Sequence, residues 1–402
     1  MSNKNSNEYE SNPKKESIIY DFIEEFSFGL AVVKSDEKCG FIDISGAIVI
    51  PLIYDSAQSF KEGLALVRMN DWVGFIDRNG NKIIDVGESN YSESFSEGLA
   101  VVSDYWGNYF GYIDRSGSLR IEKKYNFAFS FSSGLAIVYL GENKSFINHY
   151  GEVVIQIKYD EVESFSEGLA LISKDNKYGF IDQCGNEVIP IRYDKAESFS
   201  EGLALVKLDG KMGFINNSGL IVIPLIYEYA ESFSESMALV SLSDIWGNPL
   251  WGYIDKNGNE VIAIKYDNLL KFSDGLAYAT TDDWSGFIDR FGMKKIPLKY
   301  DDAESLWMGI ARVKLNNKWG LIDKFGNEIT PIKYDSIVLF DNNERMIQVN
   351  INHKIGIIDI TGKEITTVKY DEVSRFSQGI ATIKLNGKVG KIDKFGLENW
   401  DD

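Results

Sequence analysis

Short apolar runs alternate with turn-forming residues along almost the whole chain. In Tyr193–Pro224, the segments Gly202–Lys207, Met212–Asn216 and Leu220–Ile223 are rich in β-branched and aromatic residues. Gly, Asn, Asp and Ser lie between them, and this pattern is typical of short β-strands joined by turns. We therefore expect three strands in this stretch.

The same pattern returns about every 34 residues, which identifies a repeat protein. The heptapeptide SFSEGLA stands at 94–100, at 164–170 and again at 198–204. A glycine just before a Phe-Ile-Asp block marks each unit, at Gly40, Gly74, Gly111, Gly179, Gly213, Gly252, Gly286, Gly320, Gly356 and Gly390, with Ser145 in its place once. We predict a disordered polar tail over 1–17 and one array of about eleven units over 18–402.

Each unit ends its second strand with Asp or Asn, then two residues, then Gly, as in DKNG at 255–258. Such a segment suits a type I turn, because the side chain caps the turn and Gly adopts positive φ without strain. Strands two and three should therefore form a hairpin. Links such as LDGK at 208–211 suggest another hairpin before it, so each unit is expected to be a three-stranded antiparallel meander.

Five prolines stand at one position of the third strand and are expected to end it, because proline cannot donate a ladder hydrogen bond. These are Pro51, Pro190, Pro224, Pro297 and Pro331. A Tyr after the third strand and a Phe before the next unit should pack between neighbouring meanders, since one such sheet is marginal alone. The predicted fold is all-β, an open superhelical solenoid, with a closed toroid or propeller-like ring as the alternative.

Three recurrent motifs connect the chain with a known family. The segments KWGLID at 318–323 and KYGFID at 177–182, with the recurrent YD…F.EGLA.V, resemble the WG-repeat (KWG repeat) family of bacterial proteins. The resemblance covers nearly all of the chain except the tail. It implies a β-rich repeat array that serves as an interaction module. The Trp that names the family occurs here only as Trp251 and Trp319, so we interpret its slot as a packing position.

The net charge of −18 argues against nucleic acid and anionic membranes as partners. Cys39 and Cys184 are far apart, which gives no disulfide framework and fits a reducing compartment. The polar first residues contain no signal peptide, and no run approaches the roughly 18 apolar residues of a membrane helix. We expect a cytoplasmic protein, although an export signal removed beforehand would leave no trace.

The sequence offers no set of catalytic residues, metal ligands or cofactor motifs. Its two histidines, His149 and His353, are expected to be exposed turn residues. The Asp residues recur at fixed positions of the units, which favours a structural role, with Ca²⁺ or a basic partner on acidic rows as the alternative. We therefore expect a protein that is not an enzyme. A carbohydrate-active enzyme with a carboxylate pair in an aromatic groove, or a self-assembling structural protein, remain alternatives.

Departures from the repeat indicate where a partner could bind. Two residues before the marker glycine, six units carry Lys, which predicts a solvent-facing slot. Four units place large apolar residues there, and two longer links with the motif S-D-x-W-G-N, at 103–108 and 243–248, carry a Trp near a hairpin tip. We predict that these residues form a binding surface for a protein segment or a glycan, unless they fold back on their own units. The six are Trp72, Trp106, Tyr109, Trp246, Leu250 and Trp284. The predicted function is a non-catalytic binding scaffold, whose oligomeric state the sequence leaves open.

Overall fold

The computed structural model describes residues 20, 22–35, 37–87, 91–273, 275–281, 284–304, 306, 309–339, 346–377 and 379–401. Within these ranges all regular structure is β-strand, which confirms the predicted all-β class. The predicted tail 1–17 lies outside the described residues.

The described strands form eleven antiparallel sheets that follow one another along the chain. The first five sheets consist of β1 (Phe22–Ile23), β2 (Leu30–Ser35), β3 (Lys38–Asp43) and β4 (Ile48–Tyr54); β5 (Ser56–Ala57), β6 (Ala65–Met69), β7 (Trp72–Ile76) and β8 (Lys82–Gly87); β9 (Leu99–Ser103), β10 (Phe110–Asp114) and β11 (Leu119–Tyr125); β12 (Phe127–Ala128), β13 (Ala136–Leu140), β14 (Asn143–Ile147) and β15 (Val153–Gln156); β16 (Glu161–Val162), β17 (Ala170–Lys174), β18 (Lys177–Ile181) and β19 (Glu187–Tyr193). The other six consist of β20 (Lys195–Ala196), β21 (Ala204–Leu208), β22 (Lys211–Ile215) and β23 (Ile221–Tyr227); β24 (Tyr229–Ala230), β25 (Ala238–Ser243), β26 (Pro249–Ile254) and β27 (Glu260–Tyr266); β28 (Asn268–Leu269), β29 (Leu276–Thr281), β30 (Trp284–Asp289) and β31 (Lys294–Tyr300); β32 (Asp302–Ala303), β33 (Ile310–Leu315), β34 (Lys318–Asp323) and β35 (Glu328–Tyr334); β36 (Ser336–Leu339), β37 (Met346–Ile351), β38 (Lys354–Asp359) and β39 (Glu364–Tyr370); β40 (Glu372–Val373), β41 (Ile380–Leu385), β42 (Lys388–Asp393) and β43 (Glu398–Trp400).

The prediction of three strands per unit was wrong, because ten of the eleven described sheets have a fourth. The extra strand is the short segment after the Tyr that ends the preceding sheet. In the sheet β20–β23, Lys195 pairs with Lys207 and Ala196 pairs with Val206. Hydrogen bonding continues on both sides of this two-residue strand, so the segment that leads into each unit is itself part of its sheet.

The prediction that proline ends the third strand was also wrong. In β19 the strand continues through Pro190 to Tyr193, and a register shift opposite Gly179 forms a β-bulge. Since β19 is an edge strand, the missing N–H of Pro190 removes no ladder hydrogen bond. The bulge explains the marker glycine, because a Cβ at Gly179 would lie 2.6 Å from the carbonyl oxygen of Ile189.

The one unit without a marker glycine confirms this reason. Ser145 stands in its place in β14 and pairs with Gln156, while the adjacent Phe146 pairs with Ile155 without a register shift between them. The partner strand β15 ends at Gln156. Where the bulge does not cover the central strand, a side chain is therefore tolerated.

Adjacent sheets share one hydrophobic core, as the placement of Tyr and Phe predicted. Tyr193 and Phe180 from one sheet join Phe199, Val206 and Ile215 from the next in one buried cluster. The rings of Phe180 and Phe199 lie 5.0 Å apart with an angle of 63° between their planes. Stacking of neighbouring sheets therefore supplies the core.

The repeated heptapeptide SFSEGLA forms the junction between sheets. At 198–204 its Glu-Gly pair adopts positive φ at both residues, which makes a tight two-residue turn. The Ser200 hydroxyl donates to the carbonyl oxygen of Phe233 in the next sheet at 3.0 Å. The Glu201 carboxylate accepts the Ser236 N–H of the next sheet at 3.0 Å. The copied letters therefore encode contacts between units as well as a turn.

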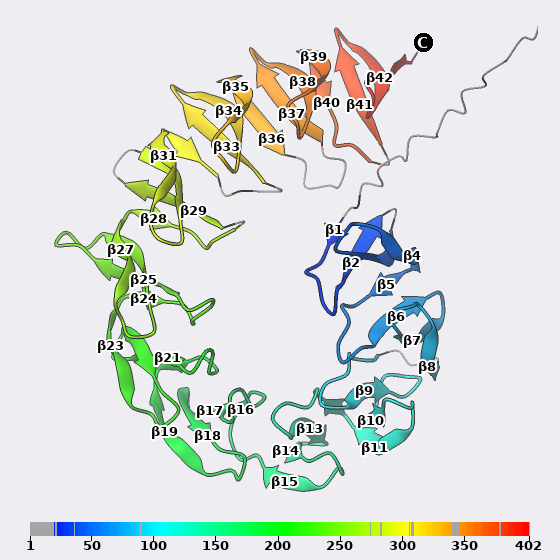
Figure 1. Ribbon diagram of the computed structural model, residues 1–402, viewed down its shortest axis with the longest axis vertical. Helices are drawn as coiled ribbons and strands as arrows, with labels where there is room; N and C mark the ends of the chain where they lie inside the picture. Colours follow the sequence, from blue (N-terminus) through cyan, green and yellow to red (C-terminus); the bar gives the residue numbers. More distant parts are fainter. Residues whose placement is uncertain are drawn as a thin grey trace, which may run out of the picture.

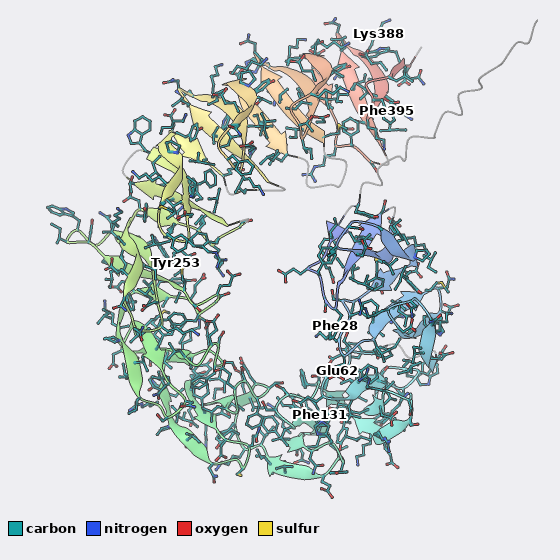
Figure 2. All side chains as sticks on the ribbon, viewed as in Figure 1. Phe28, Glu62, Phe131, Tyr253, Lys388 and Phe395 are labelled. Carbon is teal, nitrogen blue, oxygen red and sulfur yellow. The ribbon has the colours of Figure 1, made fainter. Side chains whose placement is uncertain are left out.

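Figure 1 shows the sheets in chain order along a curved path around an open centre. The last strands of the sheets, such as β19 and β23, lie on the outer side of this path, and short first strands such as β16 lie toward the centre. Figure 2 places Glu62, which belongs to a Glu-Gly turn, on the central side. The fold thus has an inner rim of Glu-Gly turns and an outer surface formed by the last strand of each sheet.

Candidate functional site

The Asp-x-x-Gly turns hold their third residue in solvent. In the turn after β30, Asp289 Oδ1 accepts the N–H groups of Phe291 and Met293, both at 2.9 Å. Burial acts to raise the pKa of Asp289, but these hydrogen bonds outweigh it and lower the pKa. Aromatic residues at the third position are 74–85% exposed; these are Tyr150, Phe291, Phe325 and Phe395. We call this third position the display position.

The two longer links contain the same turn. In the second link, Asp244 Oδ1 accepts the N–H groups of Trp246 and Asn248 at 2.8 Å, and Gly247 has a positive φ. In the first, Asp104 Oδ1 accepts the Asn108 N–H at 2.7 Å. Trp106 and Trp246 occupy the display position and are 73% and 81% exposed. Their predicted exposure at hairpin tips is therefore confirmed, and the sequence motif S-D-x-W-G-N is the signal for the turn.

The outward slot is less uniform than predicted. Tyr109 and Trp284 are about half exposed there, at 48% and 47%. For Trp72 and Leu250 the prediction of exposure was wrong, since both are half-buried. Trp72 packs against the core shared by the first two sheets, and the Lys82 ammonium lies 4.0 Å from its ring centroid. Leu250 lies opposite Leu242 in the neighbouring strand.

In five of the six units whose slot holds Lys, the side chain makes an ion pair that the sequence interpretation missed. Lys177 Nζ lies 2.5 Å from Asp194, and Lys354 Nζ lies 2.5 Å from Asp371. The hydrogen bond from Lys354, followed by one from the Asn386 N–H, lowers the pKa of Asp371. The constant spacing of 17 residues between the Lys and its carboxylate could have indicated this ion pair in the sequence. This Lys therefore has a structural role.

The six predicted site residues do not form one continuous surface. Trp72, Trp106 and Tyr109 belong to the second and third sheets and to the link between β9 and β10. Trp246, Leu250 and Trp284 belong to the seventh and eighth. Three complete sheets, β12–β15, β16–β19 and β20–β23, separate the two groups along the chain. The chain therefore presents two separate sets of aromatic residues.

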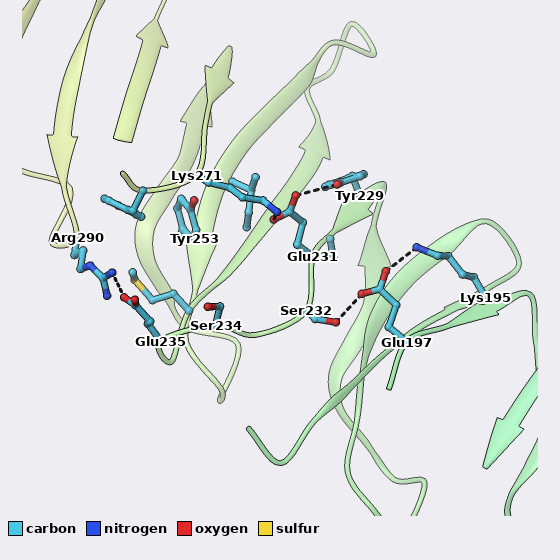
Figure 3. A pocket seen from close by; sticks show the side chains of 14 residues that line it. Lys195, Glu197, Tyr229, Glu231, Ser232, Ser234, Glu235, Tyr253, Lys271 and Arg290 are labelled. Carbon is cyan, nitrogen blue, oxygen red and sulfur yellow. Dashed lines mark hydrogen bonds and ion pairs between the residues drawn. The ribbon is translucent and has the colours of Figure 1, made fainter. Parts of the chain in front are cut away.

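A cavity of about 510 Å³ lies where the sheets β20–β23, β24–β27 and β28–β31 meet (Figure 3). The sequence interpretation did not find it. Its lining combines charged and polar side chains with apolar ones, and consists of Lys195, Glu197, Tyr229, Ala230, Glu231, Ser232, Ser234, Glu235, Met237, Leu239, Tyr253, Lys271, Phe272 and Arg290.

Every carboxylate that lines the cavity has a cationic partner. Lys195 Nζ lies 2.7 Å from Glu197, and Lys271 Nζ lies 3.1 Å from Glu231. Arg290 pairs with Glu235 (Figure 3). Burial acts to raise the pKa of Glu197, but hydrogen bonds from Lys195 and the Ser232 hydroxyl outweigh it and lower the pKa. The three carboxylates and three cations give the lining a formal charge of zero.

Aromatic rings form the base and one wall of the cavity. The buried ring of Tyr253 and the half-buried ring of Phe272 lie 5.2 Å apart. Burial raises the pKa of Tyr253, with a smaller contribution from the Glu231 charge, so its hydroxyl stays neutral and donates to the Leu270 carbonyl at 3.2 Å. Tyr229 is 40% exposed and its ring meets Trp251 edge-on. One wall therefore offers a fixed aromatic ring that is partly open to solvent.

The cavity forms where the repeat pattern is broken. Lys271 stands at a position where Ser198 and Ser232 in preceding units donate a hydrogen bond to a Glu of the unit before. Ser236 and Met237 replace the Gly-Leu of the consensus, and Met237 lines the cavity. These three substitutions were the only sign of the cavity that we found in the sequence. By sequence alone they could not be distinguished from variation that the repeat tolerates.

The two histidines differ from expectation in one case. His353 is exposed in its hairpin link, as predicted. His149 is half-buried, because its ring stacks on Phe131 at 4.3 Å and its Nε2 atom lies 3.2 Å from the carbonyl oxygen of Glu97. His149 therefore contributes to the contact between two sheets.

Among the described residues, no group of three or more His, Cys, Asp or Glu side chains is placed to hold a metal ion. The described part of the chain also contains no helix long and apolar enough to cross a membrane.

Comparison with known proteins finds one family along almost the entire chain. The family described as WG containing repeat matches residues 17–39, 40–71, 74–104, 110–143, 145–178, 178–211, 212–246, 251–283, 286–319, 319–354 and 355–388. No curated protein sequence matches the chain.

Solved structures show only distant likeness. The extracellular domain of a protein assigned as a hybrid two-component system, BT3049 of B. thetaiotaomicron, is 9% identical with a TM-score of 0.28, and the match covers 96% of this chain and 65% of that one. PorZ, a bacterial surface component of the type-IX secretion system of Porphyromonas gingivalis, is 8% identical with a TM-score of 0.33, and the match covers 96% and 59%. Hsv2p of Kluyveromyces lactis is 11% identical with a TM-score of 0.31, covering 57% and 91%. The chain thus spans less than two thirds of the length of the first two.

Proposed function

The chain belongs to the WG-containing repeat family, and from this premise we propose that it is a non-catalytic binding scaffold. The observation that carries the proposal is the exposure of Trp106 and Trp246 at the display positions of two matching turns. Large exposed aromatic side chains on a rigid support are typical of binding surfaces.

The turn geometry supports a role in binding rather than in packing. The Asp244 carboxylate accepts the N–H groups of Trp246 and Asn248 and so fixes the turn backbone. The exposed indole of Trp246 is therefore attached to a rigid turn. Tyr105 meets Trp106 edge-on at 4.7 Å, which widens the apolar surface of the first turn. Because these turns protrude instead of forming a hollow, a segment of another protein is the partner that suits them best.

An open superhelical array, rather than a closed ring, fits the chemistry of the last sheet. At interior junctions a Phe such as Phe214 packs against a Phe of the next unit, here Phe233, with ring centroids 4.8 Å apart. In the last sheet Lys391 occupies that position in β42 and is exposed. A charged residue at this position disfavours closure of a ring by the same stacking on the first sheet, and this supports the open array.

A non-catalytic role also agrees with the state of the cavity carboxylates. Each is paired with a cation, and the lowered pKa of Glu197 keeps that carboxyl ionised. A glycosidase of the usual kind needs one carboxyl group with a raised pKa to act as the acid. We therefore propose binding instead of hydrolysis.

The test compares partner capture by wild-type protein and by the double variant Trp106→Ser, Trp246→Ser in lysate of the native host. Serine occupies the display position in other turns of this chain, as Ser116 does, so the variant should fold. A matched control changes Phe325 to Ser at the same position of another turn. A binding scaffold at the Trp turns predicts one partner that the wild type and the control retain and the double variant loses. If all three proteins retain the same partners, the proposed surface is wrong.

A further inference from the structure

We propose that the cavity between β20 and β31 is a binding site for a neutral saccharide of one or two rings. This site is distinct from the Trp turns, so the proposal stands independently of the protein partner proposed above. Its volume of about 510 Å³ lies within the roughly 300–1,000 Å³ that small-molecule sites usually occupy.

The charges of the lining favour a neutral ligand. Lys195, Lys271 and Arg290 are balanced by Glu197, Glu231 and Glu235, so the cavity offers a charged ligand no net attraction. A ligand carboxylate or phosphate would have to displace a carboxylate from its cation. An ammonium group would likewise have to displace a cation from its carboxylate. A hydroxyl group needs neither exchange.

The same ion pairs provide fixed donors and acceptors. Glu231 is held by the Tyr229 hydroxyl at 3.1 Å and by Lys271 at 3.1 Å, so its oxygens keep their positions while retaining free lone pairs. Lys271 is an ammonium with three donors, and its side chain is 74% exposed. Paired donors and acceptors at fixed separation match adjacent sugar hydroxyls, each of which can donate and accept.

The wall of the cavity suits the apolar face of a sugar ring. Tyr229 is held from two directions, by its hydroxyl on Glu231 and by the edge-on contact with Trp251 at 5.3 Å. A ring that is already immobilised loses little conformational entropy when a ligand stacks on it. The buried Tyr253 and Leu239, with the half-buried Phe272, supply apolar surface next to it.

The residues that create the site occur at this junction and break the repeat. At the preceding junction Ser232 donates to Glu197 at 2.6 Å, and at the one before it Ser198 donates to Glu163 at 2.6 Å. Here Lys271 replaces that serine, and its longer side chain reaches Glu231 from the next sheet. Residues repeated in every unit serve the fold, whereas a site is built from residues that occur once.

The experiment measures binding of neutral sugars to the full chain by saturation-transfer NMR and calorimetry. The probes are glucose, N-acetylglucosamine, maltose, cellobiose and chitobiose, with glucose 6-phosphate and glucosamine as charged counterparts. We expect at least one neutral sugar to bind the wild type more tightly than its charged counterparts. The variants Lys271→Ser and Tyr229→Ala should each weaken that sugar about tenfold, as loss of one charge-assisted hydrogen bond or one stacking contact requires.

Two controls keep the test specific. Lys271→Ser restores the residue found at other junctions, so loss of binding cannot be assigned to misfolding. Ser198→Lys makes the reverse change two junctions earlier and should leave sugar binding unchanged. The proposal is overturned if none of the neutral sugars binds, if a charged counterpart binds more tightly, or if Lys271→Ser and Tyr229→Ala bind as the wild type does. None of these outcomes depends on Trp106 or Trp246, so the two proposals can fail separately.

Discussion

Lys271 Nζ lies 3.1 Å from the Glu231 carboxylate, at a position where Ser232 donates to Glu197 at 2.6 Å in the unit before. The two contacts use equivalent backbone positions of successive units. The serine closes one sheet against the next, whereas the longer lysine spans the gap and leaves a cavity beneath it. A single change of residue type within a repeated contact therefore distinguishes a structural junction from a candidate site.

The serine of the Glu-Gly turn should contribute measurably to stability. Ser200→Ala removes the hydrogen bond to the Phe233 carbonyl at 3.0 Å and should lower the free energy of unfolding by about 1 kcal/mol. Denaturant titration followed by circular dichroism measures it. Ser218→Ala is the control, since its hydroxyl bonds within its own turn to Asn216. A Ser200→Ala protein as stable as the wild type would contradict the prediction, and equal losses in both variants would show that the bond between sheets contributes no more than a bond within one turn.

The marker glycine should be intolerant of a side chain. Gly179→Ala places a Cβ 2.6 Å from the Ile189 carbonyl oxygen, and relief requires movement of the bulge in β19. We expect a loss of about 2 to 3 kcal/mol in the free energy of unfolding. The control is Ser145→Ala, which also leaves a Cβ at this position and should cost less because β15 does not cover it with a bulge. A fully stable Gly179→Ala protein would contradict the steric explanation.

The unit, its turns and the tyrosine and phenylalanine that pack between sheets could all be predicted from the sequence, because each depends on local residue types at fixed spacing. The fourth strand could not, since Lys195 and Ala196 have no strand-like composition and pair with β21 only after the chain bends at Asp194. The bulge at Pro190 was also missed, because proline alone does not show whether a strand ends or bends. The cavity is lined by Lys271 and Met237 from two units, whose proximity no local pattern encodes.

Removing one aromatic ring from the core between two sheets should make the two parts of the array unfold separately. Phe199→Ala removes a ring that lies 5.0 Å from Phe180 in the core between two sheets, and should cost about 3 to 5 kcal/mol. Since each sheet packs only on its neighbours, the loss should weaken one junction and produce two unfolding transitions in calorimetry. Phe325→Ala, at an exposed display position, should leave a profile like that of the wild type. A single transition in Phe199→Ala at lower temperature would indicate cooperativity across the whole array.

Protonation of the capping Asp residues at low pH should lower the stability of the fold. The Ser116 hydroxyl, with further hydrogen bonds from backbone N–H groups and Arg120, lowers the pKa of Asp114 from 3.8 to about 2. A carboxyl group whose pKa is lowered in the folded state stabilises the fold above its unfolded pKa, and this contribution is lost as the pH falls from about 4 to about 2. In Asp114→Asn the melting temperature should depend less on pH in that window, because Asn216 shows that an amide can cap the same turn. Identical pH profiles for the two proteins would contradict the assignment to Asp114.

Replacing an exposed tryptophan should change the free energy of unfolding less than replacing a half-buried one. Trp246→Ser removes an indole that is 81% exposed, so the free energy of unfolding should change by less than about 0.5 kcal/mol. Trp72→Ser should cost clearly more, because the indole packs against the core of the first two sheets and carries the Lys82 ammonium at 4.0 Å. Paired denaturant titrations test the difference. If Trp246→Ser were as destabilising as Trp72→Ser, the Trp246 turn would be part of the fold, and its exposed ring would no longer support a role in binding.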